Sequence, residues 1–455
     1  MSLASAYRVL VLALLISVKI GLGFSSQATA QADDPRQRLV ALAEAGQWAA
    51  AEALARDLLA VRPRDVTVLI VMSRALRAAG DPAGARDFAA RALDAATTDA
   101  ERFAAMTELA AAAHATGRPL VAQVWLRRAV QVAPSPALRD SAIRNYRAVA
   151  ADNPLTVQLQ FGVAPSSNVN NGSQADTVDI GGLDFVLNPD ARALSGTEIT
   201  AGVSLAYRHA GLGGLPARTG LALAVQEVRL SGSARAAAPE VEGDDYDQAT
   251  VEWRFDQALR PATAPVRLRF EARLGHSWYG GRDLSDYLRA GFGADWGDAR
   301  RLTSVALSWE RQERLDLSSR SATILRLDAG RQWRLASGDA LGLTAFLRDT
   351  ASRSVEVDHL AAGLSASHDM GTVAGGWLTL ATGVAAEWRS YDRSPYRAGG
   401  RRDLRLRLSA RVGFPRAETW GFLPEVTIEA SRVASDVDLY DSRDVTLRLG
   451  LRSAF

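Results

Sequence analysis

The chain has 455 residues, with 53 basic and 51 acidic side chains and a formal net charge of +2. This balance gives no indication of a nucleic-acid partner or any other polyanion. Lys19 is the single lysine, so the cations are almost all arginine. The sequence contains no cysteine, so we expect no disulfide, no thiolate metal site, no cysteine nucleophile and no N-terminal lipid anchor on this chain.

Residues 1–30 have the pattern of a secretory signal peptide. Arg8 precedes the ten apolar residues VLVLALLISV, and the small-residue sequence ATA ends at Ala30. The alternative is a signal anchor, but ten apolar residues are too few to span a bilayer. We therefore expect an exported mature protein of a Gram-negative cell, without a transmembrane helix.

Residues 31–150 are rich in Ala, Leu and Arg at helical spacing, and the pattern repeats. Three glycines stand 34 and 37 residues apart, and each is followed five residues later by an alanine. The recurring positions are Gly46, Ala51 and Pro63, then Gly80, Ala85 and Thr97, then Gly117, Ala122 and Pro134. The set resembles the tetratricopeptide repeat, in which a turn glycine, a small crossing residue and a closing proline recur in each helix pair.

Two features depart from that repeat. Thr97 replaces the closing proline, and Ala55, Ala89 and Leu126 stand where an aromatic residue is usual. Residues 135–151 are predicted to form a capping helix. The alternative interpretation is an unrelated helical bundle. If the chain is a repeat solenoid, it is expected to bind protein segments in its groove.

From residue 151 to residue 455 the hydrophobic period changes from helical spacing to strict alternation. In residues 404–412, for example, Leu404, Leu406 and Leu408 share one face, and Arg405, Arg407 and Arg411 share the other. Fourteen such segments are predicted. They begin near residues 155, 197, 217, 245, 264, 285, 301, 320, 340, 356, 374, 401, 419 and 441.

This pattern fits either a soluble sandwich or a transmembrane barrel. The barrel is favoured by segments of about 9–12 residues, by charges of both signs on the inward faces, and by aromatic residues near segment ends. The aromatic residues that we assign to these interface girdles are Tyr207, Trp278, Tyr279, Trp296, Trp309, Trp333, Trp388, Tyr391, Trp420 and Phe455. We thus predict an α + β multidomain protein: an N-terminal α-solenoid followed by an antiparallel 14-stranded transmembrane β-barrel.

The last segment, DVTLRLGLRSAF, is an amphipathic strand that continues to the end of the sequence. It is predicted to pair with the first strand, because an open sheet edge in hydrocarbon leaves backbone groups unsatisfied. Leu447, Leu449, Leu451 and Phe455 also resemble the C-terminal targeting signal of outer-membrane proteins. That resemblance implies recognition by the barrel-assembly machinery.

Two short motifs near the ends of the barrel resemble those of the surface lipoprotein assembly modifier (Slam) family. The first includes Pro165, Ser167, Asn168 and Asn170. The second includes Tyr440, Asp441, Arg443, Gly450 and Phe455. Ser166 and Asp436 depart from the usual residues. The alternative interpretation of the first motif is an ordinary turn.

The Slam resemblance implies a protein translocator of the outer membrane with a periplasmic N-terminal domain. Its expected partners are outer-membrane lipid, a client lipoprotein or related secreted protein, and a periplasmic chaperone, with no nucleic acid. Inward arginines could contact the client, although a solvated barrel interior would also explain them. These candidates are Arg267, Arg269, Arg273, Arg405, Arg407 and Arg411.

Three other functions compete with translocation. An exopolysaccharide exporter would need a charge stripe matched to its polymer. A hydrolase could use the Asp358–His359 or His368–Asp369 neighbours, but no recognisable nucleophile or metal motif accompanies them. A simple porin would have no evident use for the helical domain. We expect no enzymatic activity and no cofactor or metal.

Overall fold

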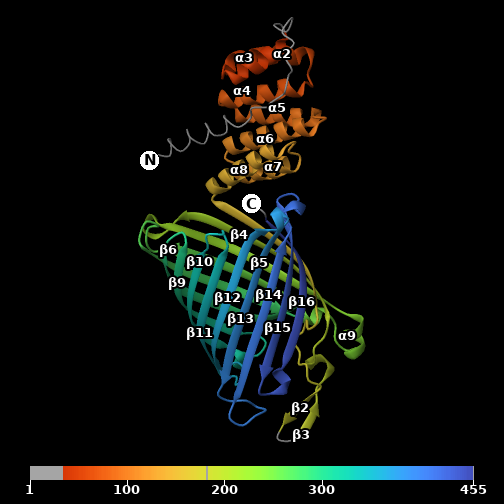
Figure 1. Cartoon of the computed structure of the whole chain (residues 1–455), viewed down its shortest axis with the longest axis vertical. Coiled ribbons are helices and arrows are strands. Elements are labelled where there is room, and N and C mark those ends of the chain that lie inside the picture. Colours follow the sequence, from red (N-terminus) through yellow and green to blue (C-terminus); the bar gives the residue numbers. More distant parts are fainter. Residues whose placement is uncertain (1–33, 181–182, 454–455) are drawn as a thin grey trace. The chain divides into compact units, whose positions relative to one another are not determined.

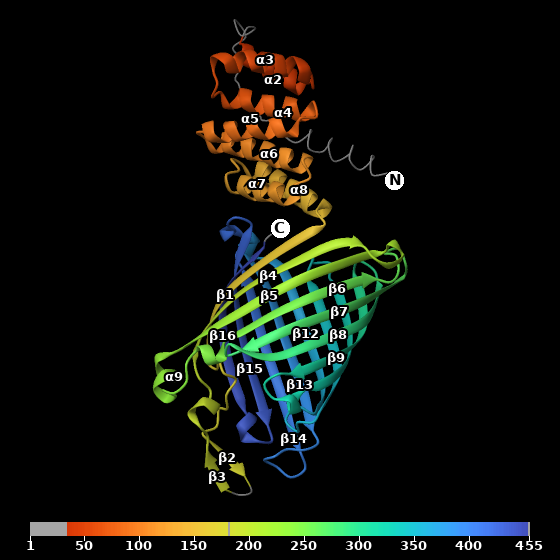
Figure 2. The same cartoon turned by 180° about the vertical axis from the view of Figure 1, so that it is seen from behind.

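The computed structural model describes residues 34–180 and 183–453, shown from two opposite sides in Figures 1 and 2. The predicted signal peptide and Phe455 lie outside these residues. The chain divides into two compact units at the junction of Asn153 and Pro154, close to the predicted boundary. The first unit is helical and the second is a β-barrel.

Seven helices form the described part of the first unit, and they follow the predicted repeat. Each turn glycine lies between the two helices of a pair with a positive φ, 71° at Gly46, 86° at Gly80 and 70° at Gly117, a conformation that favours glycine. The pairs are α2 (Pro35–Glu44) with α3 (Trp48–Val61), α4 (Val66–Ala78) with α5 (Pro82–Ala95), and α6 (Asp99–Ala115) with α7 (Pro119–Gln131). The closing helix, α8, spans Pro136–Asp152.

The helix boundaries have clear local causes. In α4, α5, α6 and α8, the side chain of the residue before the helix accepts a hydrogen bond from a free backbone N–H group of the first turn. Prolines occupy the first position of α5, α7 and α8. Pro63 and Pro134 lie in the links that follow α3 and α7. Every helix in the described residues is too short or too polar to span a bilayer.

The small residues of the repeat allow close packing of the helices. Ala51, Ala85 and Ala122 are fully buried, as are Ala55 and Ala89 at the positions where an aromatic residue was absent. Tetratricopeptide-like spacing therefore produces close helix crossings filled by alanine instead of aromatic rings.

A buried carboxylate joins two helices of this unit. Glu108 on α6 is 4% exposed, and its carboxylate lies 2.6 Å from Arg74 Nε and 3.5 Å from Arg77 Nη2 on α4. Since α4 and α6 belong to successive helix pairs, this ionic group fixes their spacing across the repeat.

Substituting a crossing alanine with leucine should destabilise the helical unit. We expect Ala85→Leu to lower its free energy of unfolding by about 1–3 kcal/mol, because the added methyl groups have no space at a fully buried position. Ala83→Leu on the exposed face of α5 is the matched control and should change it by less than about 0.5 kcal/mol. Urea unfolding of the full chain in detergent, followed by helical circular dichroism, tests this; equal effects of the two variants would contradict the packing.

The start of α6 should make stability depend on pH. The Glu101 carboxylate accepts the backbone N–H groups of Thr97 and Thr98 at 2.8 and 3.0 Å, which lowers the pKa of Glu101 below its ordinary value of 4.5. A lowered pKa means that this stabilisation is complete above about pH 4.5 and is lost as the pH falls through the folded value.

We expect Glu101→Ala to cost about 1 kcal/mol or less at neutral pH, since the carboxylate is partly exposed, and to cost less as the pH falls through the folded pKa of Glu101. Glu101→Gln retains an uncharged acceptor and should show a smaller loss without this pH dependence. The same unfolding assay, repeated across pH, measures both. A constant difference between wild type and Glu101→Ala would contradict the assignment.

The second unit is a closed antiparallel barrel of fourteen strands, as predicted. Each strand begins within four residues of its predicted start. They are β1 (Leu155–Ser166), β4 (Gly196–Ala210), β5 (Pro216–Leu230), β6 (Gln248–Ala258), β7 (Val266–Tyr279), β8 (Arg282–Gly297), β9 (Arg301–Arg314), β10 (Ala322–Arg334), β11 (Ala340–Ser352), β12 (His359–Val373), β13 (Leu378–Tyr391), β14 (Arg401–Gly413), β15 (Phe422–Ser435) and β16 (Ser442–Ser453).

The strands are 11–16 residues long, so the predicted lengths of 9–12 were too short. The backbone ladder continues past the apolar segment into polar residues, as in the RDLSD sequence that opens β8. Alternating hydrophobicity marks only the part of each strand with an apolar outer face, so it underestimates the length.

Apolar side chains form continuous rows across the outer face. Val163, for example, is aligned with Ile199 of β4 and with Leu449 of β16. A closed sheet with such an exterior is the architecture of an outer-membrane barrel. The exposed apolar residues include Val157, Leu159, Phe161, Val163, Leu205, Leu221, Leu223, Val225, Leu274, Leu307, Leu325, Leu327, Leu347, Leu364, Leu404, Leu406, Leu408, Leu447, Leu449 and Leu451.

Two predicted interface aromatics are on the other face. Tyr207, Trp296, Trp309 and Trp388 are exposed, but Tyr391 is 5% exposed and is aligned with Arg401 of β14. Tyr391 has the parity of the charged face, as does Tyr279, which is aligned with Gln248 of β6. The assignment of these two residues to the outer girdle was wrong.

The two ends of the barrel differ in their connections. The end at which β1 begins and β16 ends has the connections 211–215, 259–265, 298–300, 335–339, 374–377 and 414–421. The opposite end, here called the distal end, carries the long connections 167–195 and 231–247. Loop 167–195 contains the hairpin of β2 (Thr177–Ile180) and β3 (Leu183–Val186), which the sequence pattern did not predict.

Candidate functional site

The inner wall of the barrel is lined with paired charges. Most inward arginines lie within ion-pair distance of a carboxylate on the same or a nearby strand, so charges of both signs alternate along the wall. The pairs are Arg254–Glu252, Arg269–Asp295, Arg273–Asp256, Arg289–Glu310, Arg326–Asp328, Arg348–Glu387, Arg389–Glu387, Arg407–Glu429, Arg448–Glu198 and Arg452–Glu425.

The six predicted inward arginines differ in their pairing. Arg269, Arg273 and Arg407 are paired with carboxylates. The remaining three are Arg405, whose Nε is buried without a hydrogen-bond partner in the described residues, and the exposed Arg267 and Arg411.

Some inward contacts connect strands that are not neighbours. The Tyr287 hydroxyl on β8 donates to Glu252 on β6 at 2.6 Å, and β7 presents Gly275 opposite Tyr287. Arg348 on β11 donates to Glu387 on β13 at 2.8 Å, across β12. Such contacts cross the concave side of the sheet, which identifies the charged face as the interior.

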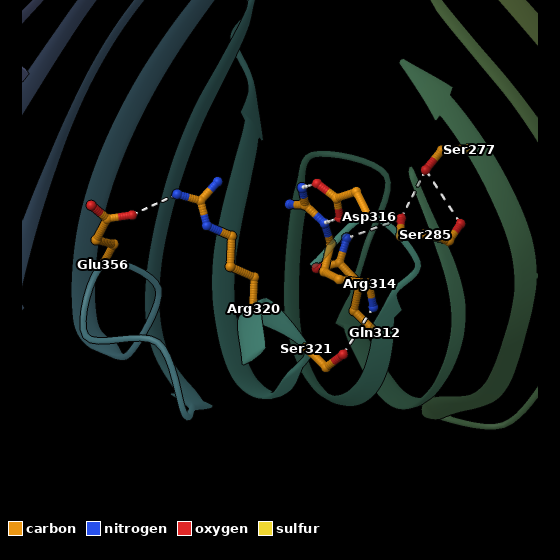
Figure 3. Close-up of polar contacts among 8 residues, drawn as sticks. All are labelled: Ser277, Ser285, Gln312, Arg314, Asp316, Arg320, Ser321 and Glu356. Carbon is orange, nitrogen blue, oxygen red and sulfur yellow. Dashed lines mark hydrogen bonds and ion pairs between the residues drawn. The ribbon is translucent and has the colours of Figure 1, made fainter. Parts of the chain in front are cut away.

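A row of polar contacts follows the distal ends of β7 to β10 (Figure 3). Ser285 bonds to Ser277 at 2.8 Å and accepts from Gln312 at 3.3 Å. Arg314 donates two hydrogen bonds to Asp316, and this contact lowers the pKa of Asp316 below its usual range. The Arg314 backbone N–H donates to Ser321 at 2.9 Å, so the 315–321 connection is fixed to the wall.

The row continues through Glu356, which lies between two other connections. Arg320 donates to the Glu356 carboxylate at 2.6 Å, and the Tyr440 hydroxyl lies 3.4 Å from its other oxygen. Burial raises the pKa of Tyr440 to about 12, so the hydroxyl stays protonated and is the donor. One carboxylate therefore joins the 315–321, 353–358 and 436–441 connections.

Tyr440 also covers a buried arginine at the mouth. The Arg401 guanidinium lies 3.5 Å from the centre of the Tyr440 ring and 3.8 Å from that of Tyr391, and Arg401 is 5% exposed. Tyr396 packs edge-on against Tyr440, and His359 stacks on Tyr391. We call Arg320, Glu356, Tyr391, Tyr396, Arg401 and Tyr440 the rim cluster.

Sequence analysis missed most of the rim cluster. Glu356, Arg320 and Arg401 belong to connections or strand ends widely separated along the chain, where hydrophobic alternation carries no information. Tyr440 was noted only as part of a motif, and its role follows from closure of the barrel.

Closure brings the two predicted motifs together. Ser166 and Ser167 both donate to Asp444 beside the second motif, at 2.9 and 3.1 Å, and the Val445 N–H donates to Ser167 at 2.9 Å. The β1–β16 ladder is interrupted between Val163 and Ser166, next to Pro165, which has no N–H to donate. Side chains thus replace part of the ladder at the distal end.

The two asparagines of the first motif hold loop 167–195. Asn168 is 4% exposed; its amide accepts the Gly172 N–H at 2.8 Å and donates to the carbonyls of Gly172 and Arg443 at 2.9 and 3.2 Å. Asn170 donates to the Arg192 carbonyl and accepts the Leu194 N–H. The motif is therefore more than a simple turn, because it ties the loop to the start of β16.

The remaining predicted residues lie on β16 and β12. Leu447, Leu449 and Leu451 point outward on β16, and their strand pairs with β1 as expected; Phe455 is outside the described residues. His359 and His368 lie on β12 with opposite parity, and His368 bonds to Asp339 at 2.9 Å. The described residues contain no group of three or more His, Cys, Asp or Glu side chains that could hold a metal.

No family model and no curated protein matches this chain, so the Slam assignment remains an expectation. Solved structures with detectable similarity include OprB of Pseudomonas putida, with 12% identity, 68% of this chain and 96% of that chain covered, and a TM-score of 0.39. OmpT, an outer membrane protein of Vibrio cholerae, has 9% identity, coverage of 66% and 99%, and a TM-score of 0.36.

The type III secretion translocator chaperone SycD of Yersinia enterocolitica is similar over 26% of this chain and 79% of its own, with 14% identity and a TM-score of 0.24. At these values none of the three similarities supports a statement about function. The barrel fold rests on its own strand pairing.

Removal of the Asn168 amide should weaken the closed barrel. We expect Asn168→Ala to lower the temperature of the heat-induced mobility shift in gel electrophoresis, because buried backbone groups lose partners at about 1–3 kcal/mol each. Asn188→Ala, an exposed change in the same loop, should leave it unchanged. Identical shift temperatures for wild type and Asn168→Ala would rule out a stabilising role.

Proposed function

We propose that this protein is an outer-membrane translocator that delivers surface lipoproteins or related secreted proteins to the cell surface. The observation that carries the proposal is the combination, in one chain, of a helical repeat unit with a closed 14-stranded barrel whose inner wall is polar. Repeat solenoids bind protein segments, and a barrel of this size lies between side-chain-filled eight-stranded barrels and open porins.

The connections support an orientation. Outer-membrane barrels have short periplasmic turns and longer extracellular loops, and here the long loops 167–195 and 231–247 share the distal end. The helical unit precedes β1, which starts at the end with the shorter connections. In our proposal the helical unit therefore lies in the periplasm, where it would receive a client or a client–chaperone complex.

The inner wall suits passage of a polypeptide of mixed sequence. Because its arginines are largely paired with carboxylates, neither acidic nor basic client segments would meet a strong uncompensated charge. An exopolysaccharide exporter needs a charge stripe of one sign, which the observed pairing does not provide.

Photo-crosslinking tests the route directly. Ser365 faces the interior in the middle of β12, and the neighbouring Leu364, which is 54% exposed, faces outward. A photoreactive amino acid is introduced at each position in turn. A client in transit should crosslink at position 365 and not at position 364. Crosslinking at both positions or at neither would argue against passage through the interior.

A gene deletion tests the cargo. Protease treatment of intact cells should show at least one lipoprotein shielded in the deletion strain and exposed again after complementation with the full chain. Unchanged exposure of all lipoproteins together with loss of exopolysaccharide would overturn the proposal in favour of polysaccharide export.

A further inference from the structure

Inward side chains of the barrel, from serine to arginine and tyrosine, lie over glycines of the adjacent strand. In ten directly aligned pairs, a side chain occupies the space that a Cβ on the opposite glycine would need. The pairs are Gly162–Thr200, Gly202–Gln160, Gly275–Tyr287, Gly291–Glu271, Gly293–Arg269, Gly330–Ser304, Gly342–Ser367, Gly363–Phe346, Gly383–Ser409 and Gly413–Thr379.

Phe346 on β11 shows what this arrangement does. Three of its ring atoms surround the place where a Cβ of Gly363 would stand, so the ring lies along the wall over β12. The Arg326 guanidinium covers the ring, 4.0 Å from its centre, and is held by two hydrogen bonds to Asp328 at 2.7 and 2.8 Å. The apolar ring is thus enclosed between backbone and a paired charge.

Tyr287 on β8 repeats the arrangement elsewhere in the barrel. Its ring lies over Gly275 of β7, and its hydroxyl extends to Glu252 on β6 at 2.6 Å. Both bulky aromatics are therefore held along the sheet, with their exposed parts bound to charged groups. If the residue opposite were larger than glycine, the aromatic side chain would have to turn away from the wall.

We propose that Gly275 and Gly363 determine the width of the lumen, and so select an extended polypeptide as the transported form. This inference rests on the proposed function for the identity of the cargo. With a side chain at either glycine, the aromatic ring would rotate into the lumen and narrow it for ions and polypeptide alike. The glycines act through Phe346 and Tyr287 without contacting cargo themselves.

The test compares single-channel conductance of the full chain in planar bilayers. Gly363→Leu should reduce conductance, and the Gly363→Leu/Phe346→Ala double variant should restore it, since the ring that would block the lumen is gone. Ala362→Leu, the neighbouring residue with outward parity, adds bulk to the lipid side and should leave conductance unchanged. Wild-type conductance in Gly363→Leu, or no recovery in the double variant, would overturn the proposal.

Further measurements distinguish a change in lumen width from a folding defect and from an error in the proposed cargo. The heat-induced mobility shift shows whether Gly363→Leu forms a folded barrel. If it does not, Gly275→Leu provides the second test: its conductance should fall, and the Gly275→Leu/Tyr287→Ala double variant should recover it. Wild-type conductance in Gly275→Leu, or no recovery in the double variant, would overturn the proposal. Surface delivery of the client should fall and recover with conductance. If conductance follows these expectations but no client depends on the protein for surface delivery, the proposed function is refuted. The role of the two glycines in lumen width would still hold.

Discussion

The barrel depends on backbone hydrogen bonding in a medium that supplies no water. Each strand must find partners on both edges, so β1 must meet β16, and the sheet closes. Among the described residues this seam has four aligned pairs, whereas β1 and β4 align along the whole of β1. Ser166, Ser167 and Asn168 supply side-chain bonds where the ladder fails, and they place the 436–441 connection where Tyr440 can cover Arg401.

Closure creates an interior in which every large side chain competes for space. The structure resolves this competition with glycines on the inward parity and with carboxylates beside the arginines. Tyr287 reaches Glu252 because Gly275 presents no side chain between them. The same two devices, absent side chains and paired charges, leave a polar inner surface that carries charges of both signs. Under the proposed function, such a surface would not bind a passing polypeptide strongly.

Alternation of apolar and polar residues predicted the strand number, the facing of residues such as Leu404 and Arg405, and the position of the final strand. Glycine periodicity predicted the helix pairs through Gly46, Gly80 and Gly117. The pattern did not reveal strand ends, the parity of Tyr391, or the β2–β3 hairpin, because polar residues at the rim give no periodic signal. It also could not reveal that Asp444 and Glu356 bond to residues far away in sequence.

The β1–β16 contacts also affect the time course of folding. Ser166 and Asp444 stand 278 positions apart along the chain, so their hydrogen bond forms only after almost the entire polypeptide has been synthesised and exported. Joining such distant segments carries a large loop-closure entropy and is intrinsically slow. Until it happens, the first strand keeps one edge unsatisfied. Closure of the β1–β16 seam is therefore expected to be a late and slow step in the assembly of this barrel.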